Sequence, residues 1–274
     1  MAVFTDNTPI SLIKGFSNGR HNRRCHWFPA SDYNQLQDHQ KIVGEALINL
    51  AGVQQGEKVL DLGCGTGHFT RVLSELVGPE GRVVAVDPDA ERIKIAKESS
   101  KKKPNIKFLV ENDQTFPGQD YDLVFCNHVI QRVMDKVALF KRLHEKLRSG
   151  GSFVLLTFDG TPEFMADILD AFSEFAGPDF HHKLMYEQQV WETASTYREL
   201  AEAAGFVVKS IDTKQSHEEW GSLKELISYF HGVSHGLFDI STVDEESLEQ
   251  YRVENNLRSF HVPRKLLYIK VTKP

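Results

Sequence analysis

The residues with the clearest chemical potential are a glycine-rich segment, DLGCGTG at 61–67, and the acidic residue Asp87 that follows it. Glycines allow a tight turn and let a ligand approach the backbone closely, because they carry no Cβ. The segment joins an expected buried strand to an expected helix, and Asp87 ends the next expected strand. A carboxylate at that place can accept hydrogen bonds from both hydroxyls of a ribose. The pattern therefore predicts a site for a ribose-containing ligand.

The spacing of the glycines argues against two common nucleotide-binding loops. Glycines at 63, 65 and 67 form GxGxG, whereas the dinucleotide fingerprint requires GxGxxG, and His68 holds the place of its last glycine. A phosphate-binding loop of the GxxxxGK[ST] type is excluded because no Lys-Ser or Lys-Thr follows the glycines.

Short apolar strands alternate with helices on both sides of this loop. Strands are expected at 58–62, 82–86, 106–110, 121–126, 152–158, 206–212 and 263–272. Helices are expected at about 36–50, 68–77, 90–102, 133–147, 162–175, 196–204, 222–231 and 245–257. This alternation predicts an α/β fold with a parallel, doubly wound sheet.

The organisation of the chain predicts one large domain. Residues 1–30 lack sustained periodicity and are expected to form an N-terminal arm or lid, followed by a domain over 31–274. Insertions near 160–195 and 213–258 are expected over the carboxyl edge of the strands, which is where open α/β folds bind ligands.

A series of spaced motifs identifies a family resemblance. The motifs are VLDLGCGTG at 59–67, VD at 86–87, ND at 112–113, YDLVF at 121–125 and LRSGG at 147–151. In this order they resemble the class I S-adenosylmethionine-dependent methyltransferases, over residues 57 to about 158. The resemblance implies a Rossmann-like sheet of seven strands whose last strand is antiparallel, with S-adenosyl-L-methionine as the cofactor.

The resemblance also implies roles for individual residues. The loop abuts the methionine part of the cofactor through Gly63, Cys64, Gly65 and Gly67. Asp61 orients the methionine ammonium and Asn127 offers it a carbonyl, while Asp87 takes the ribose hydroxyls. Asp113 accepts from the adenine amino group, with Gln114 as its neighbour. Carboxylates and carbonyls favour a cationic cofactor electrostatically; the alternative is that Asp87 and Asp113 cap the helices that follow them.

The outer segments resemble a narrower group of enzymes. NQLQ at 34–37, GTPEF at 160–164 and the long helical insertion at 213–258 are similar to the juvenile hormone acid and trans-aconitate methyltransferases. Those enzymes methylate a carboxylate on a small molecule. After the fourth strand that group usually shows His-Trp, where this chain has Gln131 and Arg132, so we expect a more polar pocket.

The acceptor side of the site is predicted from five residues. An ionised carboxylate needs no general base, whereas a phenol or an amine does. His128 is the candidate base, with a pocket-wall histidine as the alternative, and Gln37 is a candidate hydrogen-bonding residue. Tyr33, Gln131 and Arg132 are expected to contact the substrate, and Arg132 would suit an anionic one.

Composition and charge limit the partners. The chain has 274 residues and a net charge of −6, which argues against a nucleic-acid partner. Its three cysteines show no CxxC spacing, as expected for free thiols in a reducing, cytoplasmic compartment. No uncharged apolar run approaches the roughly 20 residues that span a bilayer, and no histidine pattern predicts a metal site.

Together these observations predict a methyltransferase that acts on a small molecule, by O-methylation of a carboxylate or another polar oxygen. Two alternatives stay open. One is an RNA- or protein-directed methyltransferase of the same fold. The other is a cofactor-binding interaction module without catalysis, since binding alone does not establish turnover.

Overall fold

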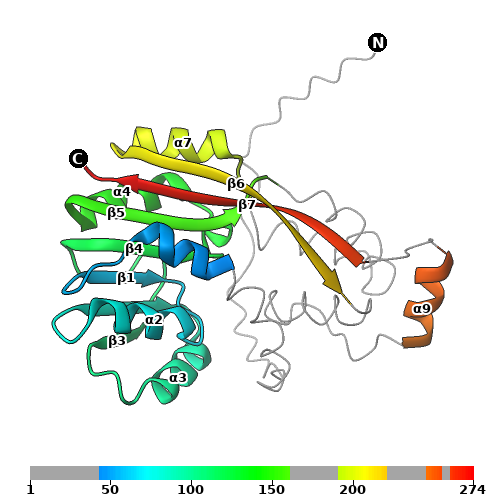
Figure 1. The fold of residues 1–274 in the computed structure, drawn as a ribbon, viewed down its shortest axis with the longest axis horizontal. Helices are drawn as coiled ribbons and strands as arrows, with labels where there is room; N and C mark the ends of the chain where they lie inside the picture. Colours follow the sequence, from blue (N-terminus) through cyan, green and yellow to red (C-terminus); the bar gives the residue numbers. More distant parts are fainter. Residues whose placement is uncertain (1–42, 161–190, 221–244, 255–259) are drawn as a thin grey trace, which may run out of the picture.

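A seven-stranded mixed sheet forms the centre of the molecule (Figure 1). The computed structural model describes residues 43–160, 191–220, 245–254 and 260–274. The strands are β1 (Lys58–Leu62), β2 (Arg82–Asp87), β3 (Ile106–Val110), β4 (Tyr121–Asn127), β5 (Leu147–Phe158), β6 (Val207–Trp220) and β7 (Phe260–Thr272). Their order across the sheet is β3-β2-β1-β4-β5-β7-β6. β1 to β5 pair in parallel, while β7 runs antiparallel to both β5 and β6, which confirms the predicted fold class.

Helices cover both faces of this sheet. The described helices are the segment 43–51, α2 (His68–Val77), α3 (Ala90–Ser99), the 3-10 helix η1 (Ile130–Arg132), α4 (Lys136–Lys146), α7 (Ala194–Ala203) and α9 (Glu245–Glu254). Side chains alternate between the two faces along each strand. Val59 and Leu123 pack with the segment 43–51 and α2, whereas Leu60 and Val124 pack with α4 and α7. The result is three layers, in which all five parallel strands end at the same edge.

The last strand also fixes the helix at 43–51 against the sheet. The Tyr268 hydroxyl donates to the carbonyl oxygen of Val43 at 3.1 Å. The Lys270 ammonium donates to the carbonyl oxygens of Leu50 and Ala51 at 2.9 and 3.1 Å, which satisfies carbonyls that the helix end leaves unpaired. Residues more than 200 positions apart are thereby held together.

Several sequence-based boundaries differ from the structure: β5 begins at Leu147 and not at 152, β7 begins at Phe260 and not at 263, and α3 ends at Ser99 and not at 102. The strand expected at 206–212 continues to Trp220 and pairs with β7 as far as Phe260, so 213–220 is strand and not helical insertion. Its outer residues are polar and show no apolar alternation, so pairing with β7 determines their conformation. The helix expected from 133 begins at Lys136 as α4, and its apolar residue Val137 is 52% exposed.

Several predictions fall on residues outside the described ranges. They are the arm or lid at 1–30, the helices near 162–175 and 222–231, and most of the insertions near 160–195 and 213–258. The helix expected at 36–50 is described from residue 43, and those expected at 196–204 and 245–257 are confirmed as α7 and α9.

The packing of α4 gives a test of the fold. Phe140 is 1% exposed, and its ring lies edge-on to Phe153 at 5.5 Å between centroids and to Phe206 at 6.4 Å. Phe140→Ala is expected to lower the free energy of unfolding by about 3–5 kcal/mol, because it leaves a cavity. Val137→Ala on the same helix, at a 52% exposed position, should change it by about 0.5 kcal/mol or less. Urea titration measures both, and equal losses would contradict this account of the core.

Candidate functional site

The loop between β1 and α2 is built from glycines in left-handed conformations. Gly63, Gly65 and Gly67 have φ of 76°, 55° and 80°, a region that residues with a Cβ rarely adopt. The amides of Gly63 and Cys64 both donate to the carbonyl oxygen of Val86, at 2.8 and 2.9 Å. These two bonds hold the start of the loop against the carboxyl end of β2.

The space around the three glycines differs. A Cβ on Gly63 would lie 2.2 Å from Cγ2 of Val129, and one on Gly67 would lie 3.0 Å from Cβ of Ala96, so both positions are closely packed. A Cβ on Gly65 would meet no atom within 4 Å. Gly65 therefore exposes its backbone to open space, as a loop that a ligand approaches must do.

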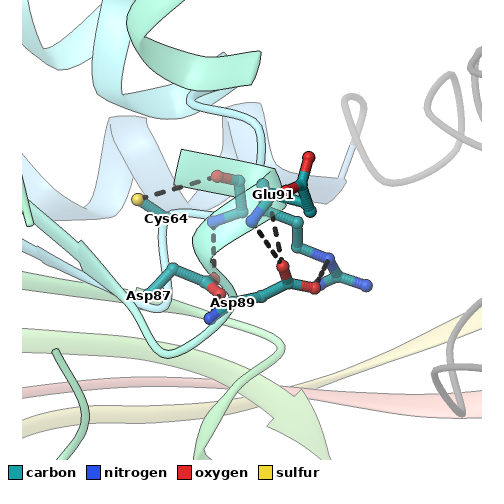
Figure 2. Close-up of polar contacts among 6 residues, drawn as sticks. Cys64, Asp87, Asp89 and Glu91 are labelled. Carbon is teal, nitrogen blue, oxygen red and sulfur yellow. Dashed lines mark hydrogen bonds and ion pairs between the residues drawn. The ribbon is translucent and has the colours of Figure 1, made fainter. Parts of the chain in front are cut away.

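Asp87 ties the glycine loop to β2 (Figure 2). Its Oδ2 accepts from the amide of Gly65 at 2.9 Å, and its Oδ1 accepts from the amide of Asp89 at 3.0 Å. Asp89, and not Asp87, is the N-cap of α3, since its side chain accepts from the amides of Glu91 and Arg92. A carboxylate offers about four acceptor sites, so Asp87 retains capacity for a ligand hydroxyl.

Asp61 is a second carboxylate at this edge, 3% exposed. Its Oδ2 accepts from the Thr70 hydroxyl on α2 at 2.5 Å. The pKa of Asp61 is raised to about 7, mainly by burial. The hydrogen bond from Thr70 opposes this rise, and the charge of Asp87 adds to it. Within the described residues neither carboxylate takes part in an ion pair. Asp87 therefore has no cationic side chain paired with it among the described residues, and a bound cation would favour the ionised form of Asp61.

Thr70 is a site residue that the sequence analysis missed. The buried residues of α2 are Thr70, Leu73, Ser74 and Val77, whereas Leu76 on the same helix is 40% exposed. Thr70 could have been found from the sequence, because it lies three and seven residues before the apolar residues Leu73 and Val77 and so faces the same side of the helix.

Two thiols lie near these carboxylates. Burial is the main cause that raises the pKa of Cys64, and the charges of Asp61 and Asp87 raise it further. Burial, followed by the charge of Asp61, raises the pKa of Cys126 to about 12. Both therefore stay protonated at neutral pH and are poor nucleophiles.

The end of β4 adds a buried acceptor. Oδ1 of Asn127 is buried and has no hydrogen-bond partner in the part of the chain that the structure describes. In the same described part, buried oxygens without a partner also occur at Ser100, Tyr197, Ser210 and Thr272, and Asn127 is the one that ends β4 beside the glycine loop, where a ligand would explain it. Asp61 pairs in register with Phe125 of β4, so Asn127 extends beyond Asp61 toward the glycine loop.

The turn after β4 carries three of the predicted acceptor-side residues. His128 has φ of 55°, and its ring lies 5.1 Å from that of Phe158. Gln131 is 4% exposed; its Nε2 donates to the carbonyl oxygen of His128 at 2.9 Å, and its Oε1 accepts from the Thr157 hydroxyl at 3.4 Å. Arg132 ends η1 and is partly exposed. Tyr33 and Gln37 lie outside the described residues.

The segment after β3 holds the predicted adenine-binding residues. Asn112 Oδ1 accepts from the amides of Gln114 and Thr115 at 2.8 and 3.1 Å, which forms a compact turn. The carbonyl oxygen of Asp113 accepts from Arg142 Nη1 at 2.7 Å. No helix occurs between β3 and β4, a stretch the structure describes throughout, so Asp113 does not act as a helix cap.

Metal-binding clusters and membrane-spanning helices are both absent from the described residues. They contain no group of three or more His, Cys, Asp or Glu side chains that could hold a metal ion. Their helices include none with the length and apolar character needed to span a bilayer.

Comparison with known proteins identifies the family. A family model described as a methyltransferase domain matches residues 54–226, more than half of the chain. The chain belongs to the class I S-adenosylmethionine-dependent methyltransferases. The predicted family and its cofactor are thereby confirmed.

Relatives within this family methylate different atoms, according to their names. The ubiquinone/menaquinone biosynthesis C-methyltransferase UbiE of Pectobacterium atrosepticum is 30% identical over 162 residues, which covers 57% of this chain and 62% of UbiE. A malonyl-[acyl-carrier protein] O-methyltransferase of Ilyobacter polytropus is 30% identical over 134 residues, 48% of this chain and 49% of that enzyme. The chain thus matches less than two thirds of the length of these relatives.

Solved structures of the family share the fold. The YcgJ protein of Bacillus subtilis superposes with a TM-score of 0.60 at 16% identity, covering 86% of this chain and 98% of its own. Geranyl diphosphate C-methyltransferase of Streptomyces coelicolor, solved with S-adenosyl-L-homocysteine, gives 0.57 at 15% identity, covering 89% and 84%.

The residues of this family member fit its cationic cofactor. Among the described residues, two carboxylates without an ion pair, the unpartnered Oδ1 of Asn127 and the open space at Gly65 lie at or beside this loop. Buried charges and polar atoms are costly unless they are paired. A ligand that brings a positive charge and hydroxyl groups would supply the missing partners.

The raised pKa of Asp61 predicts a pH-dependent stability. In the folded chain the carboxyl group of Asp61 stays protonated up to about pH 7, whereas an aspartate in the unfolded chain loses its proton near pH 4. Unfolding between these values releases a proton, so this contribution to stability is present at low pH and is lost as the pH rises to about 7. In Asp61→Asn this slope should disappear. Urea unfolding of both proteins from about pH 5 to 8 measures it, and parallel curves would place the effect elsewhere.

Proposed function

We propose that this chain is an S-adenosylmethionine-dependent methyltransferase of a small molecule, and that it methylates a carboxylate or another polar oxygen. The observation that carries the cofactor half of the proposal is a set of acceptors on β1, β2 and β4: Asp61, Asp87 and Asn127, with no ion pair to either acid among the described residues. A positively charged sulfonium cofactor complements such a set.

Each acceptor has a proposed part in holding the cofactor. Asp61 and the Asn127 carbonyl would orient the methionine ammonium, and Asp87 would accept the ribose hydroxyls. Asp113 would accept the adenine amino group, with Gln114 beside it, and the glycine loop would abut the methionine part. When bound, S-adenosylmethionine supplies a methyl group on a cationic sulfur, which is already a strong electrophile. The chain's task is then to position the acceptor in line and to exclude water.

The acceptor side is proposed to include His128 and Arg132 in the turn after β4. Arg132 would pair with an anionic acceptor, and His128 would take a proton from a hydroxyl. Tyr33 and Gln37 are proposed to complete this side. The resemblance to juvenile hormone acid and trans-aconitate methyltransferases supports a carboxylate acceptor, and the relative named as a malonyl-[acyl-carrier protein] O-methyltransferase supports an oxygen.

Methylation of carbon is the second candidate, because the relatives include UbiE, named as a C-methyltransferase. A carbon nucleophile or a phenol must lose a proton, so it needs a base at the position of His128. A carboxylate is already ionised at pH 7. Methylation of a carboxylate therefore does not depend on a base at His128, whereas methylation of a carbon or a phenol does.

A product screen tests the proposal directly. The purified chain is incubated with labelled S-adenosylmethionine and a panel of small carboxylic acids, phenols, quinols, amines, RNA and histones. The proposal expects a labelled methyl ester or ether from a small molecule. A methylated ring carbon would favour the second candidate, and label on RNA or histones would overturn the small-molecule assignment.

Asp87→Ala tests the cofactor half of the site. S-adenosylhomocysteine is expected to raise the melting temperature of the wild-type chain, because it binds the native state. Asp87→Ala should reduce that increase to near zero, since it removes the ribose acceptor and releases the amide of Gly65. The matched control is Asp122→Ala, which removes a carboxylate bonded to the amide of Lys58 and to Arg148. A full shift in Asp87→Ala would contradict the assignment.

His128→Asn tests the acceptor half. Asparagine tolerates the left-handed conformation that His128 adopts, so the turn is retained while the imidazole is lost. With a hydroxyl or carbon acceptor, kcat is expected to fall by about 10²–10⁴. With a carboxylate acceptor it should change by no more than a few fold, because no base is needed. Initial rates on the acceptor found in the product screen decide between them.

A further inference from the structure

The turn after β4 is held in an unfavourable backbone conformation. His128 has φ of 55°, and Asp120 is the other non-glycine residue with positive φ among those that the structure describes. Such a conformation costs free energy in a residue with a Cβ, so it persists only where surrounding contacts enforce it.

Gln131 supplies the decisive contact. Its Nε2 donates to the carbonyl oxygen of His128 at 2.9 Å, and its Oε1 accepts from Thr157 on β5 at 3.4 Å. The amide of His128 donates to the carbonyl oxygen of Leu156 at 2.9 Å. Because Gln131 is 4% exposed and Thr157 is fully buried, water cannot readily replace these bonds. The side chain of Gln131 thus links the turn to the adjacent strand.

The same turn contacts the cofactor loop. Val129 packs so closely on Gly63 that a Cβ there would lie 2.2 Å from Cγ2 of the valine. At the start of the turn, Asn127 has a buried Oδ1 with no hydrogen-bond partner within the described ranges. A shift of the backbone at His128 would therefore move Val129 against the loop and displace Asn127.

We propose that Gln131 is a positioning residue: its amide holds the turn at 127–131 in the conformation that shapes the cofactor site. It acts through His128 and Val129 and does not touch the substrate, which was its expected partner from the sequence. This inference rests on the proposed function, because it takes the S-adenosylmethionine site as what is being positioned. Its probe is S-adenosylhomocysteine, so the test needs no knowledge of the acceptor.

The first measurement compares the affinity of variants for S-adenosylhomocysteine by calorimetry. Gln131→Leu preserves volume and removes both hydrogen bonds, and it is expected to weaken binding about tenfold. Gln131→Glu keeps the acceptor for Thr157, and donates to His128 when its carboxyl group is protonated. Its affinity, relative to the wild type at the same pH, should therefore recover as the pH falls.

A rescue experiment separates positioning from general stability. Glycine adopts positive φ at no steric cost, so His128→Gly in the Gln131→Leu background should restore affinity to within about threefold of the wild type. The matched control is Asp120→Gly in the same background, at the other positive-φ position. It should raise the melting temperature and leave the affinity low.

Failure of the proposed function and failure of the positioning role of Gln131 give different results. A wild-type chain that does not bind S-adenosylhomocysteine overturns the proposed function. Wild-type affinity in Gln131→Leu and in Gln131→Glu at every pH overturns the positioning role alone, as does equal rescue by Asp120→Gly. If Gln131→Leu does not fold, the pH series of Gln131→Glu supplies the test.

Discussion

The site depends on one constraint, which is that the chain must leave β1 and enter α2 while its backbone amides face β2. The amides of Gly63 and Cys64 donate to Val86, and that of Gly65 donates to Asp87. This arrangement needs positive φ at three positions in five residues, and glycine satisfies it without strain. The same bonds that close the loop also place Asp87 beneath it, so the loop and its acid form one unit.

Electrostatics follow from that geometry. Asp61 and Asp87 end adjacent parallel strands, so the fold brings two carboxylates together in a buried place. Without a neighbouring cation the more buried acid, Asp61, holds its proton up to about pH 7. A cationic ligand reverses that balance, because it favours the ionised form. Burial and mutual repulsion destabilise the ionised carboxylates in the unliganded site, and a positively charged ligand stabilises them when it binds.

Sequence reasoning succeeded where the determinants were local. The positions of the first four strands and of Asp87 follow from short motifs and apolar periodicity. It failed where partners lie far apart in the chain. The polar end of β6 is a strand because β7 pairs with it, and the hydrogen-bond partner of the Gln131 side-chain oxygen is Thr157, which lies 26 residues away. Neither partner is visible in a local pattern.

The two halves of the site come from different parts of the sheet. Most of the cofactor half comes from the ends of β1 and β2 and the loop between them. The acceptor half begins in the turn after β4, which is held by the Gln131 side chain and by the bond from the His128 amide to Leu156, and which contains a residue with positive φ. A substitution in that turn is therefore expected to affect both halves, because Val129 packs on Gly63 of the glycine loop.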